Sequence, residues 1–261
     1  MILDRHAEGS ICWMELGAGD ASEAKKFYQG LFGWTWKELP SGDGTFYAIA
    51  RSEGRDVAAL IPWAGEAAAL PAQWRMYAAA DDADRLAAKA ATCGGSAMTL
   101  PAEVSDFGRT ALIRDPAGAS LGIWQARKHT GFGITGRPGT LAWAELVTRD
   151  IETAKRFYRG WLGWEHRDLE PGGYTLFLRE GRPAAGMVRM APDPGDRPAH
   201  WRPYFQVEDC AAAAQKAKSL GAECLFPATL IPGVGSVSML RDPQGAVFAL
   251  MQPATDSVMR P

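Results

Sequence analysis

The sequence predicts an α+β protein made of two tandem domains, each of which is a pair of βαβββ modules. The first observation behind this prediction is an internal repeat, because Trp13-Met14-Glu15-Leu16 returns 130 positions later as Trp143-Ala144-Glu145-Leu146. The aromatic run FYQGLFGW over 27–34 returns at the same offset as FYRGWLGW over 157–164. The second observation is that the order strand, helix and three strands occurs twice within each copy. A repeat of this length indicates two copies of one domain rather than a solenoid array.

Length and composition fit two ordinary globular domains. The chain has 261 residues, of which 47% are hydrophobic and 22% charged, and its net charge is −2. Each copy has about 125 residues, which is a common domain size. No basic run could neutralise a row of phosphates, so we expect no nucleic-acid partner. No apolar run approaches the ~20 residues of a membrane span. The charged segment 1–10 lacks the apolar region of a signal peptide, so we expect a cytoplasmic protein.

The elements of the first module can be assigned in order from residue 11. The apolar run 11–16 indicates a strand. Asp20 is a favourable helix N-cap, and Glu23 three residues later makes a capping-box-like pair with it. An i, i+3, i+4, i+7 spacing of apolar residues predicts one buried helix face, and Gly33 is placed to end that helix. The residues of this face are Ala24, Phe27, Tyr28 and Leu31. Strands are expected over 34–39, 46–50 and 57–63, with a turn at 53–55 between the last two.

The pattern restarts at residue 73 as a second module. A strand is expected over 74–80, followed by a helix that Asp81-Asp82 caps and Gly94-Gly95 ends. The buried face of this helix is expected to hold Leu86, Ala87 and Ala90. Three strands are then expected over 96–100, 109–114 and 119–126. The segment Asp115-Pro116-Ala117-Gly118 has Pro at the second and Gly at the fourth position, which predicts a β-turn between the last two strands.

The second copy follows the same order after a shortening near 41–43 that changes the offset to 127. At this offset Tyr47, Trp74, Tyr77 and Asp115 align with Tyr174, Trp201, Tyr204 and Asp242. We therefore predict domain 1 over 1–126 and domain 2 over 140–261. The segment 127–139 between them is rich in Gly, Lys, Arg and His, and is expected to be an exposed linker.

Paired βαβββ modules that carry FYxxLFGW and DPxGxxxxxxQ resemble the vicinal oxygen chelate superfamily. That group includes glyoxalase I, extradiol dioxygenases, fosfomycin-resistance transferases and bleomycin-binding proteins. More narrowly, the chain resembles the tandem glyoxalase-like proteins of actinobacteria that are often labelled hydroxylases. The resemblance covers nearly the whole chain and implies that each sheet curls into a cup, with its helices on the convex side. Its motifs are specific for the fold and weak for the reaction, because this fold hosts many chemistries and also plain binders.

In the metal-using relatives, one ligand lies seven residues before the Asp that caps the helix, and another lies seven residues after the Asp of DPxG. The corresponding residues here are Trp13, Trp143, Arg75, Arg202, Gly122 and Ala249. Indole has no free lone pair, guanidinium stays protonated, and Gly and Ala offer no side-chain donor atom. The strands near 57–61 and 184–189 hold no carboxylate or His for a further ligand. The four cysteines share no spacing, so we expect them to be reduced and buried. We therefore predict neither a metal site nor a cofactor.

The side chains that face the cups follow from the resemblance and from the strand period of two. The candidate ligand-binding residues are Trp13, Arg75, Tyr77 and Trp124 in domain 1, and Trp143, Arg202 and Tyr204 in domain 2. Glu15 and Glu145 also face the cups and are the candidate catalytic residues, because a carboxylate in an apolar cup can have its pKa raised toward neutrality. An unpaired half-buried carboxylate is costly, so we expect ion pairs from Glu15 to Arg75 and from Glu145 to Arg202. The opposing interpretation is that these residues only build the core.

Three functions remain open at this point. The first is a metal-free small-molecule-binding protein, whose flat or aromatic ligand lies between Trp, Tyr and Phe side chains. The second is an enzyme, a lyase, dioxygenase or hydroxylase, that uses Glu15 or Glu145 as a general base or a metal held by other residues. The third is a scaffold whose filled cups bind nothing. In each case we expect a monomer, with the two domains packed as a pseudo-dimer, or a homodimer.

Overall fold

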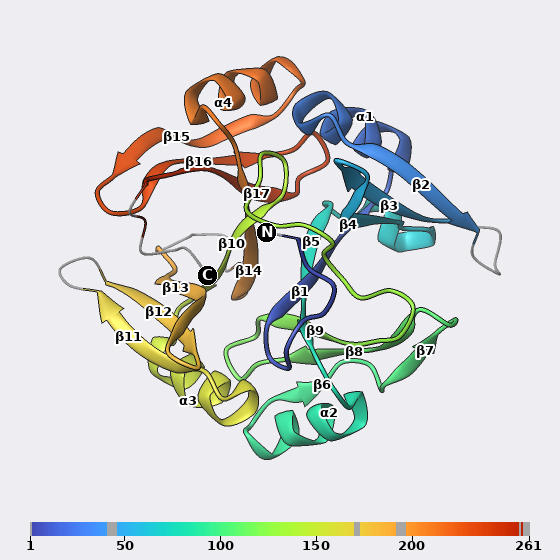
Figure 1. The fold of residues 1–261 in the computed structure, drawn as a ribbon, viewed down its shortest axis with the longest axis vertical. Helices are drawn as coiled ribbons and strands as arrows, with labels where there is room; N and C mark the ends of the chain where they lie inside the picture. The colour runs from blue at the N-terminus through green and yellow to red at the C-terminus, as the bar shows by residue number, and fades with distance from the viewer. Residues whose placement is uncertain (1, 41–45, 170–172, 192–196, 256, 258–261) are drawn as a thin grey trace.

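The computed structural model describes residues 2–40, 46–169, 173–191, 197–255 and 257, and it confirms the α+β class and the two tandem domains (Figure 1). The elements of domain 1 are β1 (Ile11–Ala18), α1 (Ala21–Phe32), β2 (Thr35–Pro40), β3 (Phe46–Ser52), β4 (Arg55–Pro62), the 3-10 turn η1 (Gly65–Ala69), β5 (Gln73–Ala79), α2 (Ala83–Thr92), β6 (Ser96–Ala97), β7 (Ala102–Val104), β8 (Gly108–Arg114) and β9 (Ser120–Ala126). Those of domain 2 are β10 (Leu141–Thr148), α3 (Ile151–Leu162), β11 (Glu165–Leu169), β12 (Tyr174–Arg179), β13 (Arg182–Arg189), β14 (His200–Gln206), α4 (Cys210–Ser219), β15 (Glu223–Ile231), β16 (Gly235–Arg241) and β17 (Val247–Pro253).

The helices begin where the sequence predicts, because an aspartate caps each of them. The side chains of Asp20, Asp82, Asp150 and Asp209 each accept a hydrogen bond from the backbone N–H three residues further on. Helices α1 and α3 end at Gly33 and Gly163, whose left-handed φ values of 73° and 72° glycine adopts without strain. The strand expected over 96–100 is shorter than predicted, since only Ser96–Ala97 pairs with β8.

The two modules of a domain share one sheet. Sheet 1 has the order β2-β3-β4-β1-β5-β9-β8-β6, with β7 also paired to β8, and sheet 2 has the order β11-β12-β13-β10-β14-β17-β16-β15. The modules meet where β1 runs antiparallel to β5, and β10 to β14. This register places Glu15 opposite Arg75 and Glu145 opposite Arg202. Residues directly opposite each other point to the same face of a sheet, so each Glu shares a face with its Arg.

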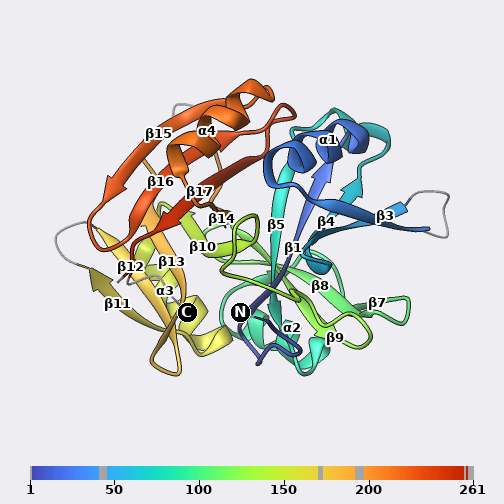
Figure 2. The same ribbon diagram turned by 45° about the horizontal axis from the view of Figure 1, so that its top comes forward.

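The convex sides of the two sheets face each other at the centre of the molecule. Strand β5 of sheet 1 lies beside β14 of sheet 2, while α1 neighbours α4 and α2 neighbours α3 (Figures 1 and 2). The concave sides therefore point in opposite directions, that of domain 2 to the left in Figure 1 and that of domain 1 to the right. None of the helices that the structure describes has the length and apolar character needed to cross a bilayer.

Two reciprocal hydrogen bonds join the repeated motifs across the domain boundary. The Tyr28 hydroxyl on α1 donates to Oδ2 of Asp242 at 2.9 Å, and the Tyr158 hydroxyl on α3 donates to Oδ2 of Asp115 at 3.0 Å. Each tyrosine oxygen also accepts from the indole of its own domain, Trp74 or Trp201, at 3.0 Å. The FYxxLFGW and DPxG motifs thus build the contact between the domains.

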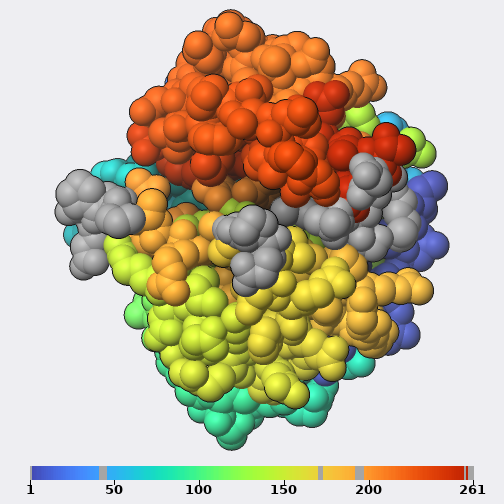
Figure 3. Space-filling view, turned by 90° about the vertical axis from the view of Figure 1, so that its left-hand side faces the viewer, coloured from blue at the N-terminus to red at the C-terminus, as the bar shows by residue number. Residues whose placement is uncertain are grey.

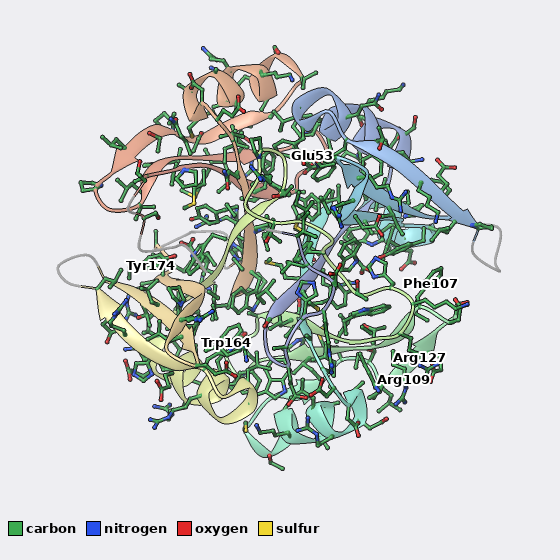
Figure 4. The ribbon with its side chains drawn as sticks, in the orientation of Figure 1. Glu53, Phe107, Arg109, Arg127, Trp164 and Tyr174 are labelled. Carbon is green, nitrogen blue, oxygen red and sulfur yellow. The ribbon has the colours of Figure 1, made fainter. Side chains whose placement is uncertain are left out.

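The predicted linker 127–139 is not uniformly exposed, so that part of the expectation is wrong. His129, Phe132 and Ile134 in this segment are buried. The carbonyl of Gly139 accepts a 2.7 Å hydrogen bond from the Trp34 indole. The equivalent indole of domain 2, that of Trp164, donates to the carbonyl of Gly9, which lies before β1 (Trp164 is labelled in Figure 4). The segment carries apolar and aromatic side chains among its polar ones, and these pack against domain 1.

Candidate functional site

In domain 1, a chain of hydrogen bonds runs from an indole to a buried glutamate. The Trp13 Nε1–H on β1 donates to the Tyr47 hydroxyl oxygen at 2.9 Å, and Tyr47 on β3 donates to Oε1 of Glu15 at 2.8 Å. The Tyr77 hydroxyl on β5 donates to the other carboxylate oxygen of Glu15. Burial raises the pKa of Glu15, while the two tyrosine hydrogen bonds act in the opposite direction. Glu15 is therefore held in place by three strands of one sheet.

Domain 2 repeats this arrangement with one addition. The Trp143 Nε1–H donates to the Tyr174 hydroxyl oxygen at 2.8 Å, and the Tyr204 hydroxyl donates to Oε2 of Glu145 at 2.8 Å (Tyr174 is labelled in Figure 4). Arg202 adds an ion pair to the same carboxylate oxygen. Its second terminal nitrogen lies 2.7 Å from the Met239 sulfur on β16. A buried carboxylate is paired here with a largely buried guanidinium, as burial of charge requires.

The expected ion pairs are confirmed in domain 2 and wrong in domain 1. In the described part of the chain, no ion pair joins Arg75 to Glu15, although the two residues are opposite each other in the strand register. The hydroxyls of Tyr47 and Tyr77 donate to both oxygens of Glu15, so the carboxylate is satisfied without the guanidinium. Arg75 is half-buried at this strand position.

Tyr47 and Tyr174 belong to the two networks, and the sequence reasoning did not select them as site residues. A signal was available, because the two tyrosines align with each other at the offset of 127. What the sequence did not show is that, in domain 1, the third strand of the first module places a tyrosine hydroxyl against the glutamate of the first strand. That contact joins residues 32 positions apart in domain 1.

The linker closes the cup of domain 1. The His129 ring lies 4.4 Å from the Trp13 ring in an edge-on contact, and the Phe132 ring lies 5.5 Å from Trp13. Trp124 turns to the linker as well, because its Nε1–H donates to the His129 carbonyl oxygen at 2.9 Å. Burial lowers the pKa of His129, which favours a neutral ring in this packing. Trp13 and Trp124, two of the predicted ligand-binding residues, are thus covered by the chain itself.

The concave side of domain 2 has its own apolar cluster, which is separate from the main core. Its buried members are Trp143, Leu176, Tyr204, Val234, Val237, Ala249 and Met251. Trp143, Tyr204 and Ala249 share this face, as the strand period predicts. Figure 3 looks onto this side of the molecule, with the module of β15–β17 above and that of β11–β13 below.

A cavity of about 610 Å³ lies at the Trp143 end of this cluster. Its apolar wall comes from β10, β13 and β17 and includes Leu141, Trp143, Ala184 and Met251. The N-terminal segment of the chain closes another side, and arginines line part of the wall. A cavity at the same edge of domain 1 has only about 140 Å³, and it is lined by His6, Cys12, Trp124 and their neighbours. The larger of these two cavities therefore lies between the sheet of domain 2 and the N-terminal segment.

The residues present do not fit a divalent metal at the positions used by metal-binding relatives. Those positions hold the indoles of Trp13 and Trp143, two guanidinium groups, Gly122 and Ala249. Within the ranges that the structure describes, no group of three or more His, Cys, Asp or Glu side chains is arranged to hold a metal ion. These positions therefore offer no side-chain donor set for a divalent metal.

Comparison with known proteins identifies the family of the fold. The model of the Glyoxalase/Bleomycin resistance protein/Dioxygenase superfamily matches residues 10–123 and 140–250. CFP32 of Mycobacterium tuberculosis, whose name describes it as a glyoxylase, is 38% identical over 253 residues, covering 95% of this chain and 97% of its own length. The anthracycline biosynthesis protein DauV of a Streptomyces species is 34% identical over 264 residues, covering 96% of this chain and 95% of its own.

Solved structures share the same architecture. The Mn(II)-bound glyoxalase from Novosphingobium aromaticivorans matches 96% of this chain and 84% of its own, with a TM-score of 0.68 at 16% identity. The 2,3-dioxygenase LapB from a Pseudomonas species matches 96% of each chain, with a TM-score of 0.66 at 15% identity. Identities this low support a common fold and do not transfer a reaction.

Proposed function

The chain belongs to the Glyoxalase/Bleomycin resistance protein/Dioxygenase superfamily, and from that premise we propose that it binds a small aromatic molecule in domain 2 without a metal ion. The observation that carries the proposal is the cavity of about 610 Å³ beside Trp143. Its volume lies in the range of roughly 300–1,000 Å³ that is typical of small-molecule sites. An indole wall next to aliphatic side chains suits a flat, apolar ligand.

The difference between the two domains supports domain 2 as the working half. In domain 1, His129 and Phe132 already make the ring contacts with Trp13 that a ligand would make. In domain 2, Trp143 is also buried, with 2% of its surface exposed, but it is one of the residues that line the cavity of about 610 Å³. The duplicated fold would then use one cup for packing and the other for binding.

The names of two relatives favour an aromatic ligand. DauV and DnrV are both named as anthracycline biosynthesis proteins, and an anthracycline contains a fused aromatic ring system. The contacts of Glu145 favour a structural role over general-base catalysis, because its Oε2 binds both Arg202 and Tyr204 and its side chain is only 4% exposed, which gives a substrate little access to it. A lyase or oxygenase activity is the competing proposal, and it would need a metal or a base that lies elsewhere in the chain.

The test compares one substitution at equivalent places in the two repeats. Trp143→Phe and Trp13→Phe both keep an aromatic ring and both remove an indole donor to a tyrosine. Binding of the neutral fluorescent probe N-phenyl-1-naphthylamine is measured for each variant by titration. We expect one site per chain in the unmodified protein, and an affinity roughly two- to threefold lower in Trp143→Phe, because the smaller phenyl ring loses part of an aromatic contact worth about 0.5–1.5 kcal/mol. Trp13→Phe should leave the affinity unchanged.

Three results would overturn the proposal. The first is an equal loss of affinity in both variants, and the second is no binding of the probe to the unmodified protein. The third is stoichiometric Mn, Fe, Ni or Zn in the purified protein, measured by elemental analysis. Far-UV circular dichroism on each variant ensures that a lost affinity reflects the site and not unfolding.

A further inference from the structure

We infer that the ligand of the domain 2 cavity carries an acidic group, and that Arg182 holds this group while the aromatic part lies on Trp143. The inference rests on the proposed function and adds the charge of the ligand to it. It starts from the unequal distribution of charge around the cavity. Arg5, Arg179 and Arg182 line the space, and Glu180 is the one carboxylate among its described lining residues.

Two of the three arginines already have acidic partners. Arg179 forms an ion pair with Glu180 at 2.8 Å, so these two charges balance each other. Arg5 lies 3.6 Å from Asp81 across the surface of domain 1, and its side chain is highly exposed. Solvent screens a pair of that kind, so it contributes little to holding Arg5 in place.

Arg182 is different, because no ion pair of its guanidinium is found among the residues that the structure describes. It is the first residue of β13, and the cavity wall continues from it through Pro183 and Ala184. A guanidinium at the rim of an apolar wall can form two parallel hydrogen bonds with a carboxylate or sulfonate. The cavity therefore has a cationic side and an apolar side.

The apolar side is formed by Leu141, Trp143 and Met251. A ligand that uses both sides is amphipathic, with an aromatic body and an anionic substituent. Arg182 is exposed, so a neutral hydrocarbon would leave its guanidinium bound to water alone, and a small inorganic anion would leave the apolar wall in contact with water. Aromatic carboxylates, sulfonates and acidic phenols are the chemical class that satisfies both.

The repeat provides a matched control for Arg182. Arg55 is the first residue of β4 in domain 1 and aligns with Arg182 at the offset of 127. Its Cβ lies near Gly133 of the linker, in the domain whose cup the linker closes. Arg55→Gln therefore removes the same charge from the equivalent strand position, outside the cavity.

Two probes that differ only by an acidic group test the inference. 1-Anilinonaphthalene-8-sulfonate carries a sulfonate, and N-phenyl-1-naphthylamine is its neutral counterpart. We expect the unmodified protein to bind the sulfonate more tightly than the neutral probe at low ionic strength, with the difference decreasing as salt is added. Arg182→Gln should weaken sulfonate binding about tenfold, which is the scale of one charge-assisted contact, and leave the neutral probe unaffected. Arg55→Gln should alter neither affinity.

The outcomes separate this inference from the function on which it rests. If both probes bind equally and Arg182→Gln changes neither affinity, the acidic ligand is refuted, while the aromatic site in domain 2 stands. If Arg55→Gln weakens the sulfonate as much as Arg182→Gln does, the charge acts at long range and the assignment to Arg182 is refuted. If neither probe binds, the proposed function itself fails.

Discussion

Removal of the Arg202 guanidinium should destabilise the protein far more than removal of the equivalent guanidinium of Arg75. Glu145 has a side chain that is only 4% exposed, and that of Arg202 is 12% exposed, so their ion pair is largely shielded from water. In Arg202→Met the apolar stem is kept and the charge is lost. The Glu145 carboxylate would then retain the Tyr204 hydroxyl as a donor and no cation.

The size of the effect follows from these contacts. Loss of one partner of a buried ion pair typically lowers the free energy of unfolding by about 3–5 kcal/mol, because the other charge stays buried without compensation. Arg75 is half-buried and makes no ion pair with Glu15 in the described part of the chain, so Arg75→Met should cost less than about 1 kcal/mol. The two variants should therefore differ by at least about 2 kcal/mol.

Urea unfolding at pH 7, followed by circular dichroism, measures both variants under the same conditions. A third variant, Arg202→Met with Glu145→Gln, replaces the isolated carboxylate by a neutral amide and should recover most of the loss, because the burial cost of the charge is removed. Equal unfolding free energies for Arg202→Met and Arg75→Met, within about 0.5 kcal/mol, would show that the ion pair does not distinguish the two domains.

Two further predictions concern the domain boundary and the glutamate of domain 1. Tyr28→Phe removes the hydrogen bond to the buried Asp242 carboxylate and should lower the free energy of unfolding by about 1.5–3 kcal/mol. A urea titration measures this change, and an unchanged free energy of unfolding would mean that water replaces the hydroxyl. Burial raises the pKa of Glu15, so the folded protein binds this proton more tightly than the unfolded chain does. The resulting stabilisation is complete below the ordinary pKa of 4.5 and is lost as the pH rises through the raised pKa. Glu15→Gln should remove the part of the pH dependence that begins above pH 4.5, and an unchanged profile would contradict this prediction.

The fold could be predicted from sequence because its evidence is local and occurs twice. Each helix has its own capping aspartate, and the helix-ending glycines Gly33 and Gly163 recur at the repeat offset. Strand periodicity also placed Glu145 and Arg202 on one face, since neighbouring strands in a known fold fix which positions are opposite.

The contacts of the site were less predictable, because they depend on side chains that are distant in the sequence. Equivalent positions in the strand register led to the expectation of equal ion pairs, yet two tyrosine hydroxyls satisfy Glu15 and a guanidinium satisfies Glu145. The burial of His129 and Phe132 was missed for a related reason. The polar and glycine-rich composition of 127–139 indicated exposure, while the fold offered these two rings a place on Trp13. Composition does not report such a tertiary partner.

The hydrogen bonds from Tyr28 to Asp242 and from Tyr158 to Asp115 join the two domains, and they affect whether either domain could exist alone. Each half donates a hydroxyl to the turn aspartate of the other, so a single half on its own would leave Oδ2 of that aspartate without this donor and would expose an aromatic surface. Such a fragment would have to meet a twin and exchange the same two bonds. Fusion of the halves into one polypeptide makes that meeting permanent, and it frees the two halves from having to remain identical.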